Sequence, residues 1–366
     1  MSGPPEPVAR ARVAVKSALV ARLEECADLS EGAQLAPRIL VGVSGGADSL
    51  ALAATTQWVA SRLGLEVEAV LIDHGLSDHS ASVSERAALQ CERLGLARCH
   101  IRPIHVDTAG EGGLENAARI ARHEAFNDMC EERSALALLL GHTLDDQAEQ
   151  VLLGLARGAG ARSLAGIPRK RGSLLRPFLG TGRDEKTGLW RRDTRAVCEA
   201  LGLDVWDDPM NDDEAYLRVA ARSRALPMLA DVFGEQVAAN LVRTADLLRD
   251  DADYLEQEAE ETYAGLRRNP PSRTPGLLAL DAYALAPLNR ALRTRVIKHA
   301  IAQASALAGA SSGKSLLRRQ ILHVDSLVSA YRGQGPIPLP GKIEAIRDEG
   351  LIVFRAGGTR FHDTQG

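Results

Sequence analysis

The sequence predicts an α/β fold in which a doubly wound, mostly parallel sheet is followed by a smaller, mainly helical domain. In the first half of the chain, short apolar runs alternate with longer segments of helical character. This alternation is typical of parallel sheets with helices on both faces. After Arg218 the helical pattern prevails. We therefore expect a first domain over residues 1–230 and a second over residues 231–366.

The individual elements follow from their residue types. Strands buried on both faces read as short, apolar, partly β-branched runs, and four such runs precede residue 141. They cover Ile39–Val43, Val67–Ile72, Cys99–Val106 and Leu136–Leu140. The helices expected between and after them cover Asp48–Leu63, Ser80–Leu94, Gly113–Glu132 and Thr143–Arg157. The second domain is expected to hold helices over Gln236–Ala264, Leu288–Leu307 and Ser315–Tyr331, and a short β-hairpin near its end.

Composition excludes several classes of protein. The chain has 366 residues, of which 45% are hydrophobic and 25% charged, with a formal net charge of -4. These values are typical of a globular protein with a substantial core. The five cysteines form no C-x-x-C pair, which argues against a disulfide scaffold or a structural zinc site. We find neither a secretory leader nor a membrane-spanning run and expect a cytoplasmic protein with reduced cysteines.

A glycine turn follows the first expected strand and reads Ser-Gly-Gly-Ala-Asp-Ser, from Ser44 to Ser49. Its two glycines, Gly45 and Gly46, let the backbone approach a ligand closely, and the N–H groups at the start of the next helix attract anions. Phosphate is the usual guest of such a turn. Asp48 adds negative charge, which a divalent cation bridging it to phosphate oxygens would resolve. The alternative is a turn in which Asp48 only caps the helix.

Polar residues also gather at the carboxyl ends of the other strands, where ligands bind in doubly wound sheets. Asp146 and Glu149, three residues apart, share one helical face and suit the binding or deprotonation of an ammonium group. His142 precedes them, and Arg122 on the preceding helix suits stabilisation of negative charge. Each has a plainer explanation. Thr143 and Asp146 form a capping-box pattern, the arginine fits a solvated helix face, and the histidine fits a buried position.

Together these motifs resemble the tRNA(Ile)-lysidine synthases of the PP-loop ATP pyrophosphatase superfamily. The resemblance rests on S-G-G-x-D-S, L-I-D-H-G-L, G-H-T-L-D-D-Q-A-E-Q with R-G-A-G, and D-D-P-M-N-D-D, and it covers nearly all of the first 230 residues. It implies an adenine nucleotide alpha hydrolase-like fold and ligation of free L-lysine to the wobble cytidine of isoleucine tRNA with a CAU anticodon. In that reaction ATP adenylates the cytidine carbonyl oxygen, and the lysine amine then displaces AMP to give lysidine.

The resemblance also implies roles for individual residues. ATP would lie on Ser44, Gly45, Gly46, Ala47, Asp48, Ser49, Asp73 and His74. Asp48 would also bind Mg²⁺. The catalytic residues would be Asp48, Arg122, His142 and Asp146. Lysine would lie on Asp146 and Glu149, although which carboxylate acts as base stays open.

A stripe of basic residues marks the expected RNA surface. Residues 157–195 contain eleven Arg and Lys against three acidic residues, in a chain that is acidic as a whole. Such a stripe attracts phosphates. The expected tRNA contacts are Arg157, Arg162, Arg176, Arg191, Arg192, Arg218 and Arg222. The sequence departs from the family pattern at Val219 and Ala220, where Asn and Arg are expected, so contacts in that segment are open. The oligomeric state is open too, with a homodimer as one option.

Two other interpretations remain. The chain fits another PP-loop enzyme, either one that thiolates tRNA at the 2-position or an ATP-dependent amide synthetase. Thiolation enzymes of this type generally need paired cysteines, which the sequence lacks. A non-enzymatic RNA-binding protein that senses nucleotide is the third option, and the carboxylates Asp146 and Glu149 argue against it.

Overall fold

The structure is a computed structural model. It describes residues 3–26, 37–73, 80–104, 113–182, 187–207, 216–309 and 316–357. The chain divides into two compact units, residues 1–249 and 250–366. The division falls inside helix α10 (Val237–Leu266), about twenty residues after the boundary expected near residue 230. That residues 1–230 form a PP-loop catalytic domain and residues 231–366 a tRNA-binding domain stays a prediction.

The first unit is built on a mixed sheet with strand order β3-β2-β1-β4-β6-β5. The first five of these run parallel, and β5 is antiparallel to β6. The strands are β1 (Arg38–Val43), β2 (Glu66–Asp73), β3 (Arg98–Pro103), β4 (Ala137–Leu139), β5 (Lys170–Arg171) and β6 (Leu174–Leu175). All four expected strands are present, and the doubly wound, mostly parallel sheet is confirmed.

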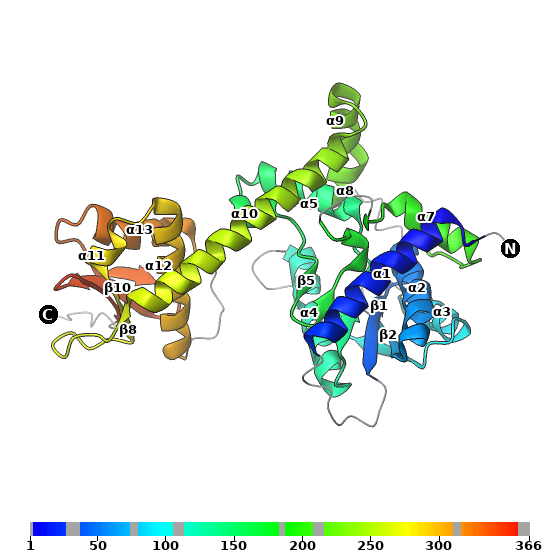
Figure 1. Cartoon of the computed structure of the whole chain (residues 1–366), viewed down its shortest axis with the longest axis horizontal. Helices are drawn as coiled ribbons and strands as arrows, with labels where there is room; N and C mark the ends of the chain where they lie inside the picture. The colour runs from blue at the N-terminus through cyan, green and yellow to red at the C-terminus, as the bar shows by residue number, and fades with distance from the viewer. Residues whose placement is uncertain are drawn as a thin grey trace, which may run out of the picture. The chain divides into compact units, whose positions relative to one another are not determined.

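Helices cover both faces of this sheet because alternate side chains of the buried strands point to opposite sides. Ile39, Val41 and Val43 of β1 join one apolar core with α1, α2, α3 and α7. Leu40 of the same strand joins a second core with α4 on the other face (Figure 1). The bounds are α1 (Glu6–Glu25), α2 (Ala47–Leu63), α3 (Ser80–Arg93), α4 (Gly113–Glu132), α5 (Leu144–Ala156), α6 (Ala161–Leu164) and α7 (Arg191–Ala200).

The segment after the sheet is helical and irregular in one place. A 3-10 turn, η2 (Pro177–Leu179), follows β6, and α8 (Leu217–Ala220), a π-helical turn η5 (Ala221–Ala225) and α9 (Leu226–Phe233) follow one another without a break. A π-turn inside a helix is uncommon and often lies at a functional site. Here it contains Arg222, whose side chain reaches the cleft described below.

The second unit has more strand than its sequence indicated. Its antiparallel sheet has the order β7-β8-β11-β10-β9. The strands are β7 (Arg267–Arg268), β8 (Leu278–Asp281), β9 (Ile337–Leu339), β10 (Ile343–Asp348) and β11 (Leu351–Ala356). The expected terminal hairpin is β10–β11. Helices α11 (Ala282–Leu285), α12 (Arg290–Leu307) and α13 (Arg318–Ser329) pack with this sheet around one apolar core.

Candidate active site

The glycine turn, the end of β4 and the start of α7 meet at one cleft of about 640 Å³ in the first unit. Strand β1 lies between β2 and β4 in the sheet. The chain therefore leaves β1 toward one edge of the sheet and leaves β4 toward the other edge. A crevice at the carboxyl ends of the strands forms at such a switch point and is where ligands bind in doubly wound sheets. The cleft is lined by Ser44, Asp48, Arg122, His142, Asp146 and Arg191, among others.

The backbone of the glycine turn takes a conformation that strongly favours glycine. Gly45 has φ 85°, in the left-handed region that disfavours side chains. The hydroxyl of Ser49 accepts a hydrogen bond from the backbone N–H of Ser44 at 3.1 Å and donates to the carbonyl of Gly46 at 2.9 Å. Ser49 thus stabilises the turn from inside and is buried. Exposed Ser44 and the first N–H groups of α2 face the cleft as an anion site.

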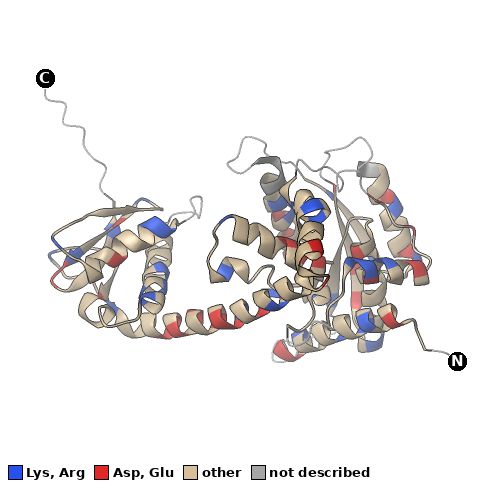
Figure 2. Cartoon of the chain, turned by 90° about the horizontal axis from the view of Figure 1, so that it is seen from above, with Lys and Arg blue, Asp and Glu red and all other residues tan. Residues whose placement is uncertain are grey.

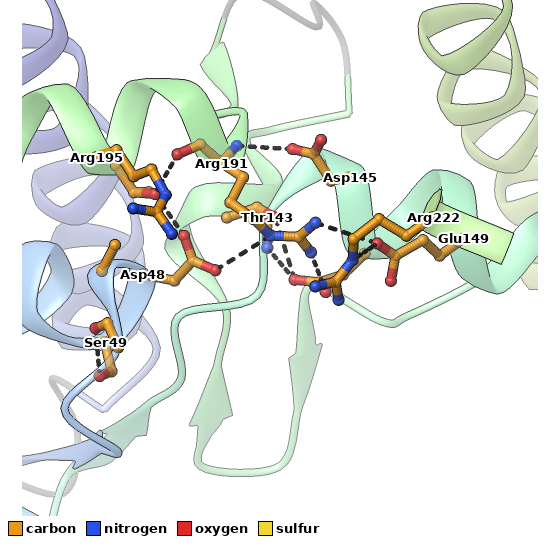
Figure 3. A network of polar contacts seen from close by, with 12 residues as sticks. Asp48, Ser49, Thr143, Asp145, Glu149, Arg191, Arg195 and Arg222 are labelled. Carbon is orange, nitrogen blue, oxygen red and sulfur yellow. Dashed lines mark hydrogen bonds and ion pairs between the residues drawn. The ribbon is translucent and has the colours of Figure 1, made fainter. Parts of the chain in front are cut away.

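Asp48 lies at the start of α2 with its carboxylate pointing toward α7 (Figure 3). The hydroxyl of Thr194 donates a hydrogen bond to its Oδ1, and Arg191 Nε lies 3.7 Å from its Oδ2. Burial, with the nearby charge of Asp146, raises the pKa of Asp48 to about 6 despite Thr194 and Arg191. Within the described residues, no group of three or more His, Cys, Asp and Glu could hold a metal ion.

Asp146 completes the capping box that its sequence pattern indicated. Its Oδ2 accepts a hydrogen bond from the backbone N–H of Thr143 at 2.8 Å, and its Oδ1 accepts one from Arg191 Nη2 at 3.0 Å. Burial pushes the pKa of Asp146 upward, but Arg191 and the Thr143 N–H outweigh it and hold the pKa below its usual value. The carboxylate is therefore both a structural cap and a negative charge on the cleft wall.

Glu149 is fully buried and surrounded by arginines. Its Oε1 lies 2.9 Å from Arg222 Nε and 3.2 Å from Arg191 Nη1, and its Oε2 lies 3.7 Å from Arg218 Nε. Burial and the negative charge of Asp146 raise the pKa of Glu149 against the effect of these arginines. Glu149 therefore holds three guanidinium groups at the cleft, a role that its helical spacing with Asp146 did not reveal.

His142 and Arg122 lie on opposite elements of the cleft, at the end of β4 and on α4. Burial, together with the charges of Arg176 and Arg122, lowers the pKa of His142 to about 3, so its ring is neutral at pH 7. Its Nδ1 is buried and has no hydrogen-bond partner among the residues that the structure describes. His123, which the sequence patterns missed, also lines the cleft. Burial and Arg122 lower its pKa to about 4.

The structure separates the seven arginines expected to contact RNA into two groups. Arg157, Arg162 and Arg192 are exposed. Figure 2 shows Lys and Arg interleaved with Asp and Glu over the helices of the first unit, so the surface there is mixed in charge. The other four, Arg176, Arg191, Arg218 and Arg222, are buried or partly buried.

These four arginines bond within the protein. Arg176 is buried and donates to the carbonyl of Pro168 at 2.7 Å. Arg191, Arg218 and Arg222 surround Glu149. For Arg176 and Arg191 the structure thus differs from the expected basic stripe, because contacts between segments far apart in sequence draw them inward.

Of the two other residues expected to bind ATP, the structure describes Asp73 at the end of β2. Asp73 is its last residue, and its carbonyl accepts a hydrogen bond from Ile104 N–H at 2.9 Å. His74 lies outside the described residues.

Helix α7, which the sequence patterns did not indicate, adds Arg195 and Thr194 to the site. Arg10 of α1 fixes the start of α7 by donating to the carbonyl of Gly188 at 2.8 Å and pairing with Asp193 at 3.0 Å.

Comparisons with known proteins agree with this geometry. Residues 17–229 match the family model of the PP-loop domain. A tRNA(Ile)-lysidine synthase of Leifsonia xyli is 45% identical over 86% of this chain and 89% of its own length. The tRNA(Ile)-lysidine synthase of Thermobifida fusca is 42% identical over 97% of this chain and 100% of its own. The U34-tRNA thiolase NcsA of Methanococcus maripaludis has a similar fold, with TM-score 0.50 and 16% identity over 66% of this chain and 80% of that one.

Proposed function

We propose that this chain, which belongs to the tRNA(Ile)-lysidine synthase family and carries its PP-loop domain, ligates free L-lysine to the wobble cytidine of isoleucine tRNA with a CAU anticodon. The observation that carries the proposal is similarity to such a synthase over nearly the whole chain, including both units. The cleft supports it, because an anion-binding turn and the carboxylates of Asp48 and Asp146 line the same space.

The first half of the reaction is adenylation of the cytidine. Its carbonyl oxygen attacks the α-phosphorus of ATP, the bond to the bridging oxygen breaks, and pyrophosphate leaves. The N–H groups at the start of α2 bind the phosphates, and Arg122 stabilises the negative charge that develops. His142, neutral at pH 7, donates or accepts a hydrogen bond without adding charge.

Asp48 is the residue that would hold Mg²⁺. It offers hard carboxylate oxygens beside the phosphate-binding turn, and Mg²⁺ commonly takes one or two protein carboxylates together with phosphate oxygens. When bound, the ion neutralises phosphate charge. The side chain of Thr194 orients this carboxylate by donating a hydrogen bond to its Oδ1.

The second half joins lysine. The lysine ammonium group first loses a proton to a carboxylate of the lysine site or to water, and the free amine attacks the ring carbon that bears the adenylated oxygen. The carbon–oxygen bond breaks, AMP leaves with the bonding electrons, and the nitrogen releases a second proton to water. Asp146, held ionised, attracts the ammonium group before attack. Glu149 is the second carboxylate of the proposed lysine site, and it also pairs with Arg191 and Arg222.

The tRNA surface is narrower than the basic stripe indicated. We assign it to exposed Arg157, Arg162 and Arg192 and to the outer faces of Arg218 and Arg222 at the cleft. Arg176 and Arg191 are left out because their side chains bond inside the protein. The second unit is proposed to bind the remainder of the tRNA, and such binding weakens as salt concentration rises.

Sulfur transfer is a weaker alternative. A sulfur carrier needs a thiol that ionises readily. Burial instead raises the pKa of Cys91 and of Cys198 to about 12, and it also raises the pKa of Cys99 and Cys130. No observation on these residues favours thiolation over ligation.

The test is an incorporation assay with the purified chain, ATP, MgCl₂, radiolabelled lysine and unmodified isoleucine tRNA with a CAU anticodon. We expect lysine to enter the tRNA in proportion to AMP released. The same tRNA with its wobble cytidine replaced by uridine is the control and should accept none. Release of pyrophosphate without lysine in the tRNA would contradict the proposal.

A further inference from the structure

Arg191 places one guanidinium group against three carboxylates, two that line the cleft and one that is buried beside it (Figure 3). Its Nη2 lies 3.0 Å from Asp146 Oδ1, its Nη1 lies 3.2 Å from Glu149 Oε1, and its Nε lies 3.7 Å from Asp48 Oδ2. Its own backbone N–H donates to Asp145 Oδ2 at 2.6 Å. The side chain thus fills the space between the residues proposed for Mg²⁺ and those proposed for lysine.

The electrostatics of this arrangement match those of a bound cation. Burial disfavours a charged guanidinium, yet Asp146 and Glu149 outweigh burial and raise the pKa of Arg191 above its usual value. Arg191 neutralises carboxylates that would otherwise repel one another in a partly dry cleft. An incoming alkylammonium group would find the same oxygens, Asp146 Oδ1 and Glu149 Oε1, already occupied.

We propose that Arg191 is an internal competitor of lysine, a specificity-determining residue whose guanidinium must leave Asp146 and Glu149 before the ammonium group of lysine binds there. The inference rests on the proposed function, because it takes the lysine site from it. The measured affinity for lysine is then set by the difference between the binding free energies of lysine and of the Arg191 guanidinium at the same pair of carboxylates. A weaker cation would fail to displace the guanidinium, and this competition favours a long side chain with a full positive charge.

The geometry allows this exchange without unfolding. The backbone of Arg191 is fixed by Asp145 and by the start of α7, so only the side chain has to turn. That side chain is 22% exposed and borders the open cleft. When it leaves, Glu149 keeps Arg218 and Arg222 as partners, so its buried carboxylate is not left unpaired, and Asp146 keeps its hydrogen bond from the Thr143 backbone.

The experiment measures lysine affinity by equilibrium dialysis of radiolabelled lysine against the full chain, together with KM for lysine and kcat in the incorporation assay. Arg191→Met removes the competing charge with a side chain of similar length. We expect its lysine dissociation constant and KM to fall about tenfold, while kcat does not rise. Arg93→Met, at an exposed position of α3, is the matched control and should bind lysine as the natural chain does.

Arg191→Lys is the second variant, which serves if the methionine variant fails to fold. A lysine side chain provides a point charge and lacks the planar fork that spans two carboxylates. We therefore expect a fall of about threefold in the lysine dissociation constant, with a melting curve like that of the natural chain. Lysine affinity that is unchanged or weaker in a folded Arg191 variant would overturn the inference.

Failure of the inference and failure of the proposed function give different results. If the natural chain incorporates lysine into tRNA and Arg191→Met binds lysine no more tightly, only the competitor role is refuted. If the natural chain incorporates no lysine, the reaction itself is refuted, and the competitor role falls with it.

Discussion

A Cβ atom on Gly141 would lie 2.8 Å from the backbone carbonyl oxygen of Asp48 and 3.2 Å from the backbone nitrogen of Ser49. The end of β4 therefore meets the first turn of α2 backbone to backbone. This contact holds the anion-binding turn beside the helix that carries Asp146, and it leaves no room for a side chain at residue 141.

Gly141→Ala should consequently lower both stability and ATP use. The added methyl group pushes the start of α2 away, and overpacking of this kind costs about 1–3 kcal/mol. We expect kcat/KM for ATP to fall about a hundredfold in tRNA-dependent pyrophosphate release. Gly265→Ala is the control, since its methyl group meets open space in α10, and it should keep full activity. Full activity in Gly141→Ala would contradict the close packing.

Asp48→Asn tests the carboxylate at the phosphate-binding turn. The amide keeps the shape but loses the charge that suits Mg²⁺. We expect pyrophosphate release to fall about a thousandfold. Thr194→Val removes the hydroxyl that donates to Asp48 but keeps the Asp48 carboxylate. We expect its rate of pyrophosphate release to fall only about tenfold. An Asp48→Asn chain that keeps more than a tenth of the natural rate would show that this carboxylate is only a helix cap.

Glu149→Gln separates the two halves of the reaction. Loss of its charge removes one of the two carboxylates that take the lysine ammonium group in place of Arg191, whereas its own ion pairs reach Arg191, Arg218 and Arg222 and not the glycine turn. We expect KM for lysine to rise about tenfold and tRNA-dependent ATP–pyrophosphate exchange to change by less than about threefold. Glu199→Gln, at an exposed position of α7, is the control. An equal loss in both measurements would indicate a structural role.

Glu68 should make stability depend on pH. Its carboxylate is fully buried in β2 and lies 2.8 Å from Arg133 Nη2, 3.0 Å from Arg38 Nε and 2.8 Å from His100 Nε2. Burial opposes ionisation, but Arg133 and the other cations prevail and lower the pKa of Glu68 to about 2 from its usual 4.5. A depressed pKa in the folded state stabilises the protein above about pH 4.5, and that contribution is lost as pH falls toward 2.

Urea unfolding of Glu68→Gln at several pH values measures this contribution. We expect the variant to lose about 3 kcal/mol at pH 7, because the partly covered guanidinium groups of Arg38 and Arg133 lose their charged partner in the core. The difference from the natural chain should shrink at pH 3. Glu66→Gln, on the same strand but more exposed, should change stability by less than about 0.5 kcal/mol. A difference that is the same at both pH values would contradict the pKa of Glu68.

Much of the sheet and several site residues were predictable, because they depend on local patterns. A short apolar, β-branched run such as Ile39–Val43 indicates a strand by its own residue types. The glycine turn is likewise recognised from its own residues, a combination that few other structures need. The helix α1 was missed because apolar residues such as the exposed Val13 also stand outside its buried face and weaken the helical pattern. The strand β8 was missed because it is four residues long and pairs with β11 about seventy residues later.

The sequence did not predict the ion pairs of the site that join residues far apart in the chain. Arg191 looked like one more cation of a basic stripe, since its partners Asp146 and Glu149 lie more than forty residues away. Arg176 also looked like a member of the basic stripe, yet its side chain is buried. Which arginine faces solvent is decided by the fold, and charge counts along a segment do not contain that information.

The most direct test of the central claim is the chemical identity of the product at the wobble position. After reaction with ATP, lysine and the isoleucine tRNA, the tRNA is digested and its wobble nucleoside is analysed by mass spectrometry. We predict a cytidine joined through carbon–nitrogen linkage to one lysine, formed only when ATP is present. An unmodified cytidine after ATP has been consumed, or a nucleoside that contains sulfur, would contradict the account.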